Sequence, residues 1–360
     1  MVKRSIRTVW HWAAITLIAT APAAAQQDPL APLPTNASAA IPENGWDSYK
    51  LYLAAKARSA GIRGATIAAT IPTLTRNARV IQLDRAQPGG APNSGVIPPF
   101  APYRREHVSA NLISRGAARF AASAPQLRAI EQRFGVDPAV LLAIFGHETS
   151  FGEVTGNFDL VQVLATLAYE GRRRAFFEDE LIAALRLIDR GTPRWQLKGS
   201  WAGATGFPQF MPSSVLRLAR DGDGDGRADI WGSQADALAS IAFYLRDAGW
   251  KPGTPWGIAV RVPRNLDRAS LRTALSAPRC PTVYRRHSRW LTMREWSALG
   301  IAPAGRTIAE DDLASLIEPD GPEATAYLLT TNYRAILDYN CSNFYALAVG
   351  LLADGIRSGG

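Results

Sequence analysis

The chain is 360 residues long, carries a formal net charge of +9, and is 47% hydrophobic and 20% charged. This composition excludes wholesale disorder and provides a substantial core for one large or two small domains. The positive charge favours an acidic partner such as nucleic acid, anionic lipid or a cell-wall polymer, without choosing among them. Two cysteines are too few for a disulfide scaffold, and four scattered histidines argue against a histidine-rich metal site.

The N-terminus has the layout of a secretory signal peptide. Basic residues at its start are followed by a short apolar stretch over 9–19 and by small residues that predict cleavage after Ala25. A membrane anchor is the alternative, but the apolar stretch is shorter than the ~20 residues that span a bilayer. We therefore expect a signal peptide over 1–25, a proline- and alanine-rich linker over 26–43, and an exported, periplasmic protein. Nucleic acid is then a poor partner.

The segments after the linker are mainly helical in pattern. Asp137 followed by Pro138 predicts a helix start, with a capping side chain before proline at the first helical position. Proline and glycine breaks with short apolar runs over 250–325 indicate a small β-containing lobe. In chain order, the pattern predicts helices over 46–60 and 62–70, an irregular loop over 88–102, a nearly continuous helical region over 107–187, a helix over 233–248, a strand over 258–262 and a last helix over 343–354.

The helix that Asp137 opens carries the first candidate for chemistry. It is apolar as far as Phe145 and ends in the segment HETSFG at 147–152, which contains Glu148. Burial raises the pKa of a carboxyl group, and a general acid must hold its proton near neutral pH. Taken alone, the pattern also fits a Glu148 that is only the first exposed residue after a core helix.

Four segments in the same order resemble the lytic murein transglycosylase B family. One of them reads KGSWAGATGFPQFMPSS, which is similar to KGSFAGAMGYGQFMPSS in the family. The resemblance covers about 46–354 and implies a single catalytic domain over 44–354. It implies a mainly α fold, with a goose-lysozyme-like α catalytic domain, a small β-containing lobe and an EF-hand-like loop. The four segments are 135–138 leading to 148–152, then 163–169, 198–214 and 339–346.

The resemblance implies a reaction as well as a fold. Members of the family cleave the β-1,4 bond between N-acetylmuramic acid and N-acetylglucosamine in peptidoglycan and leave a 1,6-anhydro end. Ordinary glycosidases use two carboxylates. Here the resemblance implies that Glu148 alone protonates the glycosidic oxygen and then takes the proton of the C6 hydroxyl, which attacks C1 of the same sugar. No cofactor is expected for this chemistry. Glu153 is expected on the surface. A hydrolytic muramidase on the same fold and a non-catalytic peptidoglycan-binding scaffold are the alternatives.

The resemblance also implies residues that bind the glycan. Short polar side chains reach sugar hydroxyls, arginines suit the carboxylates of lactyl groups and stem peptides, and tyrosines stack on sugar rings. The alternatives are that Ser200 is only a turn or cap residue, that the arginines are a solvated charged run, and that the tyrosines pack in the core. Phe151, where the family often has tryptophan, still permits sugar stacking. The candidates are Ser200, Gln209, Arg173, Arg174, Tyr244, Tyr339, Asn340 and Tyr345.

The segment DGDGDGRAD at 221–229 matches the first part of an EF-hand loop. Oxygen ligands at alternate positions and a glycine at the sixth suit Ca²⁺, but the twelfth position is Gly232. The resemblance implies a degenerate loop closed by a later aspartate, for which Asp236 is the candidate and Asp229 the competitor. A structural Ca²⁺ or Na⁺ is expected, and a solvated turn without metal is the alternative. The expected ligands are Asp221, Asp223, Asp225, the carbonyl of Arg227, and Asp236.

Cys280 and Cys341 are the only cysteines, and the exported context permits a disulfide between them, with two free thiols as the alternative. Such a bond would tie the small lobe to the C-terminal wall of the cleft. We expect glycan strands of peptidoglycan as the partner and cell-wall synthesis enzymes as candidate protein partners. We expect neither nucleic acid nor a lipid anchor, and a monomer.

Overall fold

The structure is a computed structural model that describes residues 45–86, 98–274 and 279–359. The signal peptide expected over 1–25 and the linker expected over 26–43 lie outside the described residues. Among the helices that are described, none has the combination of length and hydropathy needed to cross a membrane.

Helices dominate the described part of the chain, as the sequence predicts, and a short 3₁₀ helix, η3 (Ile71–Thr73), follows α2. The helices are α1 (Gly45–Ser59), α2 (Gly64–Thr70), α3 (Ala78–Ala86), α4 (Phe100–His107), α5 (Ala110–Ala122), α6 (Ala124–Phe134), α7 (Pro138–Thr149), α8 (Leu160–Glu170), α9 (Arg174–Asp189), α10 (Pro212–Leu218), α11 (Gln234–Asp247), α12 (Pro281–Tyr284), α13 (Met293–Ala298), α14 (Thr331–Tyr339) and α15 (Asn343–Ser358).

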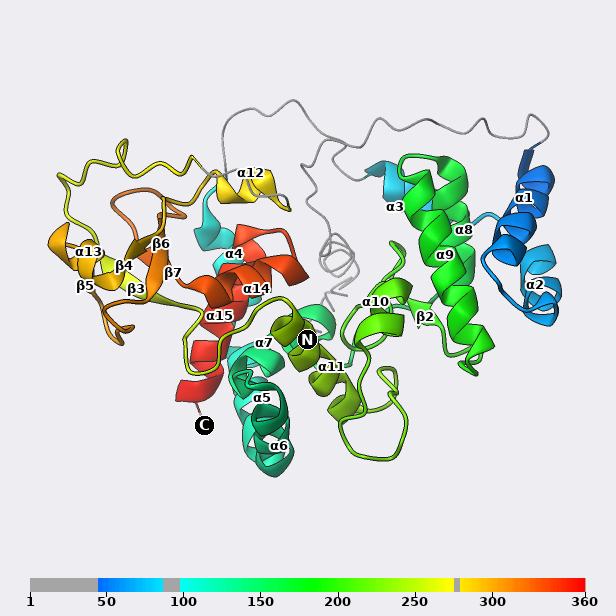
Figure 1. The fold of residues 1–360 in the computed structure, drawn as a ribbon, viewed down its shortest axis with the longest axis horizontal. Helices are drawn as coiled ribbons and strands as arrows, with labels where there is room; N and C mark the ends of the chain where they lie inside the picture. Colours follow the sequence, from blue (N-terminus) through cyan, green and yellow to red (C-terminus); the bar gives the residue numbers. More distant parts are fainter. Residues whose placement is uncertain (1–44, 87–97, 275–278, 360) are drawn as a thin grey trace, which may run out of the picture.

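Helix α7 runs through the middle of the main hydrophobic core. It packs against α5, α6, α11 and α15, which surround it in Figure 1. Every residue over 138–146 is buried, because the helix is apolar on all sides and no face of it favours water. Its start is the predicted one, since the Asp137 carboxylate accepts a hydrogen bond from the Ala139 amide at 2.9 Å and Pro138 is the first helical residue.

The α8–α9 hairpin forms a second packing centre, with α1, α2, α3 and α10 around it (Figure 1). Two buried carboxylates of α9 anchor its neighbours. Glu178 accepts hydrogen bonds from Tyr49 and Lys56 of α1 at 2.7 and 2.9 Å. Glu180 accepts a hydrogen bond from the Ser213 amide at the start of α10 at 2.9 Å. The Glu178 contacts hold α1 against α9, and the Glu180 contact holds the start of α10 there.

The small lobe is an antiparallel five-stranded sheet with strand order β4-β6-β7-β3-β5. Its core includes Trp296, which is fully buried. The predicted strand is confirmed as β3, but the sheet continues past residue 325 because β7 follows it. A separate antiparallel pair, β1 and β2, brackets the α8–α9 hairpin, because β1 precedes α8 and β2 follows α9. The strands are β1 (Phe158–Asp159), β2 (Lys198–Gly199), β3 (Gly257–Arg261), β4 (Leu291–Thr292), β5 (Ala302–Pro303), β6 (Leu313–Ile317) and β7 (Ala326–Leu329).

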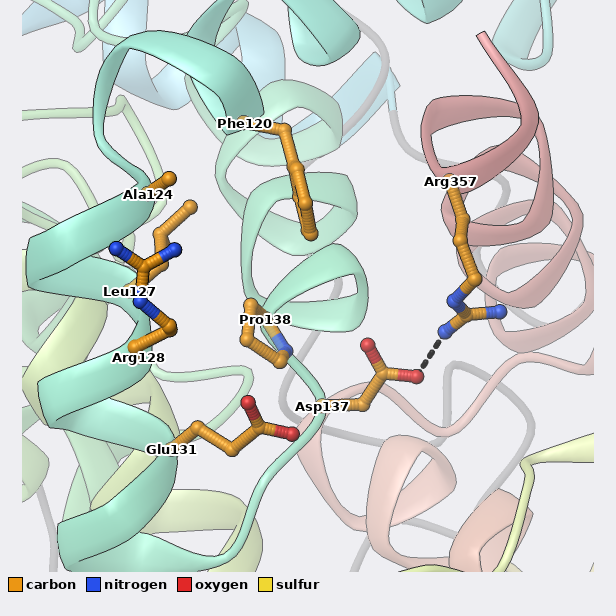
Figure 2. A pocket seen from close by; sticks show the side chains of 8 residues that line it. All are labelled: Phe120, Ala124, Leu127, Arg128, Glu131, Asp137, Pro138 and Arg357. Carbon is orange, nitrogen blue, oxygen red and sulfur yellow. Dashed lines mark hydrogen bonds and ion pairs between the residues drawn. The ribbon is translucent and has the colours of Figure 1, made fainter. Parts of the chain in front are cut away.

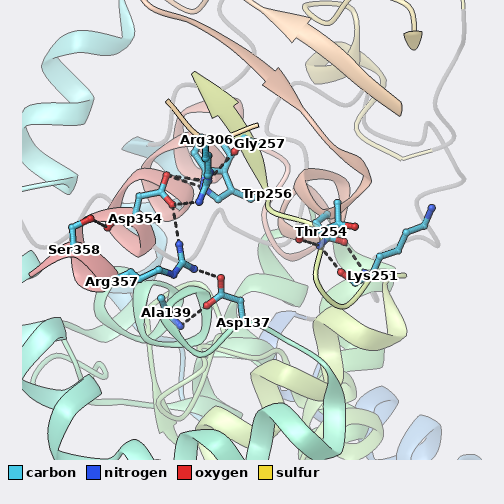
Figure 3. A network of polar contacts seen from close by, with 11 residues as sticks. Asp137, Ala139, Lys251, Thr254, Trp256, Gly257, Arg306, Asp354, Arg357 and Ser358 are labelled. Atoms are coloured by element: carbon cyan, nitrogen blue, oxygen red, sulfur yellow. Dashed lines mark hydrogen bonds and ion pairs between the residues drawn. The ribbon is translucent and has the colours of Figure 1, made fainter. Parts of the chain in front are cut away.

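A chain of charged contacts holds the lobe against the helical core (Figure 3). Arg306 of the lobe pairs with Asp354 of α15 at 2.9 Å, and the same carboxylate accepts a hydrogen bond from the Trp256 indole at 3.2 Å. Arg357, one turn later on α15, contacts both Asp354 and Asp137. The cap of α7, the end of α15 and the lobe are thereby joined.

Two predicted boundaries in the helical part of the chain also differ in the structure. The irregular loop expected to reach residue 102 ends earlier, because α4 begins at Phe100; Pro102 lies in its first turn, where proline is tolerated. The helical region expected over 107–187 is interrupted after α7, where Gly152 and Gly156 have φ values of 90° and 81° and the strand β1 follows.

Candidate active site

Glu148 lies in the last turn of α7 and is only 3% exposed. Its Oε1 atom accepts a hydrogen bond of 2.7 Å from the Tyr345 hydroxyl of α15. Its Oε2 atom is buried and has no hydrogen-bond partner among the described residues. Burial raises the pKa of Glu148 to about 8, against which the hydrogen bond from Tyr345 acts. Glu148 is therefore a carboxylic acid that keeps its proton at neutral pH.

Aromatic side chains from other helices surround this acid. The Tyr339 hydroxyl of α14 donates to the Pro208 carbonyl at 2.6 Å. The pKa of Tyr103 is raised, first by burial and then by the charge of Glu148, which places Tyr103 beside the acid. The Tyr103 oxygen is 3.4 Å from Nε2 of His147. Tyr103 is not marked by any motif in the sequence, because its proximity to the acid depends on how α4 packs.

The glycine-rich segment between β2 and α10 positions two of the predicted glycan-binding residues. The Ser200 hydroxyl accepts a hydrogen bond from the Ala204 amide at 3.1 Å and so closes a tight turn. Gln209 has a left-handed backbone with a φ value of 52°, and its side-chain amide donates to the carbonyls of Thr155 and Gly206 at 3.1 and 2.9 Å. These bonds join the segment to the loop that follows α7. Sugar contacts of Ser200 and Gln209 stay predictions.

Asn340 belongs to the predicted C-terminal wall of the cleft, and Tyr244 of α11 lies against the end of α14 that precedes it. Tyr244 is 7% exposed, its hydroxyl donates to the Asp338 carbonyl at 2.6 Å, and its ring centroid is 4.7 Å from that of Tyr339. Asn340 ends α14, and the next residue, Cys341, forms a disulfide with Cys280. The expected disulfide is present and joins the residue before α12 to this wall.

Arg173 and Arg174 lie at the junction of α8 and α9. The Arg173 guanidinium is 4.9 Å from the centre of the Phe177 ring, and burial lowers the pKa of Arg173. The Arg174 Nε atom donates to the Ala168 carbonyl at 3.3 Å. Both side chains are partly buried, so the pair is not merely a solvated charged run. Contact with substrate carboxylates stays a prediction for both.

Phe151 is buried in this structure, and stacking of its ring on a sugar stays a prediction. The residue is 5% exposed. A Cβ atom added to Gly146 or Gly116 would lie 2.6 or 3.3 Å from its ring, which shows that the ring fills a notch between α7 and α5. The positive φ value of 62° at Phe151 turns the chain back beneath α7 and directs the ring into this notch. Glu153, as expected, is exposed, and it pairs with Arg115 at 2.6 Å.

The aspartate loop brings three carboxylates together. Oxygen atoms of Asp221, Asp223 and Asp236 lie within 4.8 Å of one another. Asp236 is buried, and burial together with the two neighbouring carboxylates raises its pKa. Asp229, the competing candidate, lies outside this cluster, and its Oδ1 accepts hydrogen bonds from the amides of Trp231 and Gly232. An all-oxygen cluster of this kind fits a hard cation.

The other two expected ligands lie outside this cluster of three carboxylates. The Asp225 Oδ1 atom accepts a hydrogen bond of 2.7 Å from the Arg227 amide, which closes a local turn. Ligation by Asp225 and by the Arg227 carbonyl stays a prediction.

A cavity of about 220 Å³ lies at the opposite end of α7 from Glu148 (Figure 2). Two of its charged lining residues, Asp137 and Arg357, form an ion pair with each other. Ten residues of helix separate this end from the acid, or about 15 Å. The cavity is therefore separate from the catalytic site. Its lining residues are Phe120, Ala124, Leu127, Arg128, Glu131, Asp137, Pro138 and Arg357.

These features define a class of protein. A mainly helical core that delivers one buried, protonated carboxylic acid beside tyrosine hydroxyls is suited to general acid catalysis. Comparison with known proteins then identifies the family: a family model described as "Transglycosylase SLT domain" matches residues 46–354. The chain belongs to this family and is an enzyme, a lytic transglycosylase.

Individual relatives agree with this assignment. The chain is 30% identical over 292 residues to membrane-bound lytic murein transglycosylase B of Escherichia coli (strain K12), which covers 79% of this chain and 76% of the relative. SltB3 from Pseudomonas aeruginosa, in complex with NAG-anhNAM-pentapeptide, has a TM-score of 0.77 and 36% identity over 87% of this chain and 80% of that one. Slt35 from Escherichia coli, in complex with calcium, has a TM-score of 0.69 and 26% identity over 86% of this chain and 93% of that one.

Proposed function

We propose that this lytic transglycosylase cleaves the bond between N-acetylmuramic acid and N-acetylglucosamine in peptidoglycan, with Glu148 as its single acid and base. The observation that carries the proposal is the environment of Glu148. One carboxyl oxygen accepts a hydrogen bond from the Tyr345 hydroxyl, and the other is buried without a hydrogen-bond partner among the described residues. The unpartnered Oε2 atom is the one that can hold a proton for the substrate.

The reaction follows in two proton transfers. Glu148 donates its proton to the glycosidic oxygen as the bond from C1 to that oxygen breaks, and the N-acetylglucosamine side leaves as an alcohol. The resulting carboxylate is held by the hydrogen bond from Tyr345. It then takes the proton of the C6 hydroxyl, whose oxygen bonds to C1 and closes the 1,6-anhydro ring. Glu148 ends protonated, and no water is consumed. Because the nucleophile belongs to the same sugar, its effective concentration is high.

The neighbourhood of Glu148 supports one carboxylate over two. Its raised pKa arises from burial, opposed by Tyr345, with no contribution from another acid among the described residues. Glu153, the nearest acid in sequence, is more than half exposed and pairs with Arg115. A hydrolase would need a second carboxylate to activate water. We assign glycan contacts to Ser200, Gln209, Arg173, Arg174, Tyr244, Tyr339, Asn340 and Tyr345.

The cluster of Asp221, Asp223 and Asp236 belongs to the proposal as an EF-hand-like site for a structural Ca²⁺. Slt35, a relative of the same fold, has been solved in complex with calcium, which supports this metal. The cation would neutralise three adjacent carboxylates and hold the loop against α11. We also propose that the protein is exported to the periplasm by its N-terminal signal peptide and acts there on glycan strands, as a monomer.

The test is mass spectrometry of the fragments that the purified enzyme releases from peptidoglycan sacculi. We expect 1,6-anhydro products, one water lighter than reducing fragments, and their loss in Glu148→Gln. Glu153→Gln is the matched control and should release the same products as the unaltered enzyme. Reducing ends would contradict the proposal and indicate a hydrolase, and activity retained in Glu148→Gln would exclude Glu148 as the acid.

A further inference from the structure

The turn that follows Glu148 is held in an unusual backbone conformation. Ser150, Phe151 and Gly152 have φ values of 52°, 62° and 90°, so three successive residues are left-handed. Glycine adopts this region freely, whereas side chains with a Cβ atom are strained there. Two strained residues in succession persist only where surrounding contacts hold them, and such strain is typical of functional sites.

Arg115 of α5 supplies those contacts. Its two terminal nitrogens donate to the Ser150 hydroxyl at 3.0 Å and to the Ser150 carbonyl at 2.7 Å. One of these nitrogens also pairs with Glu153 at 2.6 Å. The guanidinium groups of Arg115 and Arg119 lie 5.3 and 4.7 Å from the centre of the Phe151 ring. Arg115 thus binds the first strained residue by its backbone and side chain and covers the second.

The same turn determines where α7 ends. The Ser150 amide donates to the Gly146 carbonyl at 2.9 Å, and the Phe151 amide donates to the Phe145 carbonyl at 3.3 Å. The Gly152 amide donates to the Thr149 hydroxyl at 3.0 Å. These bonds close the last helical turn, which contains Glu148. If Ser150 and Phe151 left the left-handed region, the bonds from the Phe151 and Gly152 amides would break, and the end of α7 would lose the closure that keeps it from fraying towards water.

We propose that Arg115 is a positioning residue for the catalytic acid: its forked side chain holds the left-handed turn at Ser150 and Phe151, and the turn in turn keeps Glu148 enclosed at the end of α7. The inference rests on the proposed role of Glu148 as the acid. Arg115 contacts neither reacting atom, and acts through the backbone. A guanidinium suits this task because its planar fork can bind the hydroxyl and the carbonyl of one residue together, which a lysine ammonium cannot do with the same geometry.

The proposal has a consequence for the pH dependence of the reaction. Burial is the main reason that Glu148 holds its proton, and the titratable groups facing it are the tyrosines Tyr103 of α4, Tyr339 of α14 and Tyr345 of α15, besides its neighbour His147. Substituting Arg115 alters none of these four side chains. A frayed helix end would therefore lower the pKa of Glu148 towards its ordinary value by exposure alone.

The experiment measures the pH profile of kcat/KM, kcat and KM separately, and amide hydrogen exchange over 145–155, in the full-length enzyme. For Arg115→Ala we expect kcat to fall by about 10- to 100-fold with little change in KM, as for a small displacement of a catalytic group. The alkaline limb of the kcat/KM pH profile should move to lower pH, and the backbone amides of the turn should exchange their hydrogens faster. Arg115→Lys should show the same changes in milder form. It replaces Arg115→Ala as the test variant if the alanine variant does not fold.

Two further variants make the test specific. Glu153→Gln removes the ion pair but keeps both bonds to Ser150, so its activity and pH profile should match those of the unaltered enzyme. Adding Ser150→Gly to Arg115→Ala should restore most of the lost kcat, because glycine forms the left-handed turn without a clamp. Arg115 variants that melt at lower temperature but keep the original pH profile and turn exchange would overturn the proposal.

The parallel Glu148→Gln variant separates this inference from the proposed function. If Glu148→Gln remains active, the assignment of the acid fails, while hydrogen exchange over the turn still reports whether Arg115 holds it. If Glu148→Gln is inactive and the turn exchanges at the same rate with and without Arg115, the acid is correct and the positioning role of Arg115 is wrong.

Discussion

Replacing Tyr345 by phenylalanine tests the electrostatics of the acid most directly. The substitution removes the 2.7 Å hydrogen bond to Glu148 Oε1 and keeps the ring, whose centroid is 4.6 Å from that of His147. A hydrogen bond to a charged group contributes about 1.5–3 kcal/mol. The bond favours the carboxylate, so its loss should raise the pKa of Glu148 further above its present value of about 8. At 1.36 kcal/mol per unit, the expected rise is about 1–2 units.

The assay is the release of anhydro fragments at low substrate concentration, which reports kcat/KM and the ionisation of the free enzyme. Activity requires protonated Glu148, so it is retained below about pH 8 and lost as the pH rises through that value. In Tyr345→Phe this limb should move upward. The plateau value of kcat/KM should fall by about tenfold or more, because the carboxylate that forms when Glu148 gives up its proton loses its hydrogen-bond donor.

Tyr333→Phe is the matched control for this prediction. Tyr333 is also fully buried, but its hydroxyl donates to the Asn343 carbonyl at 3.0 Å, away from the acid. The control should lose stability without moving the alkaline limb. An unchanged or lowered limb in Tyr345→Phe would refute the assignment of Tyr345 as the donor that stabilises the Glu148 carboxylate.

Three other outcomes concern stability. Glu148→Gln should raise the free energy of unfolding at pH 7 by up to about 3 kcal/mol. The reason is that a carboxyl whose folded pKa is raised from 4.5 to about 8 lowers stability progressively between those two pH values. Denaturant titrations should show that the difference vanishes at pH 4. Calcium at a hundred times its Kd should stabilise the fold by about 2.7 kcal/mol, as measured by calorimetry. Asp236→Asn should abolish this gain, and an equal gain in the variant would place the cation elsewhere. Replacing Cys280 and Cys341 by serine opens a loop with a sequence separation of 61 and should cost about 4 kcal/mol, or roughly 10 °C in Tm; no change on thermal melting would contradict a stabilising disulfide.

Much of the fold could be predicted from local pattern. The start of α7 follows from Asp137 and Pro138, since a cap and a first-turn proline act on neighbouring backbone atoms only. The strand β3 follows from its alternating residues. The boundary of α4 could not be predicted in the same way, because Pro102 is compatible both with a loop and with the first turn of a helix.

The candidate site was predicted in part. Glu148 was identified from its place in the chain, and Tyr345 from a second segment of the same family pattern. The burial of Phe151 could not be predicted, because it depends on a notch between Gly116 and Gly146 on two different helices. Arg115 was missed altogether, because no motif marks an arginine whose partners lie on the loop that follows another helix.

By itself, the sequence determined the mainly helical class, the order of the family segments and the acid at the end of α7. These depend on periodicity, capping and residue identity, which are local. The tertiary structure alone decided that this acid is protonated. Its pKa depends on burial by several helices and on a tyrosine 197 residues away in the chain. Desolvation and hydrogen bonding act through space, so only the packed fold brings them to Glu148.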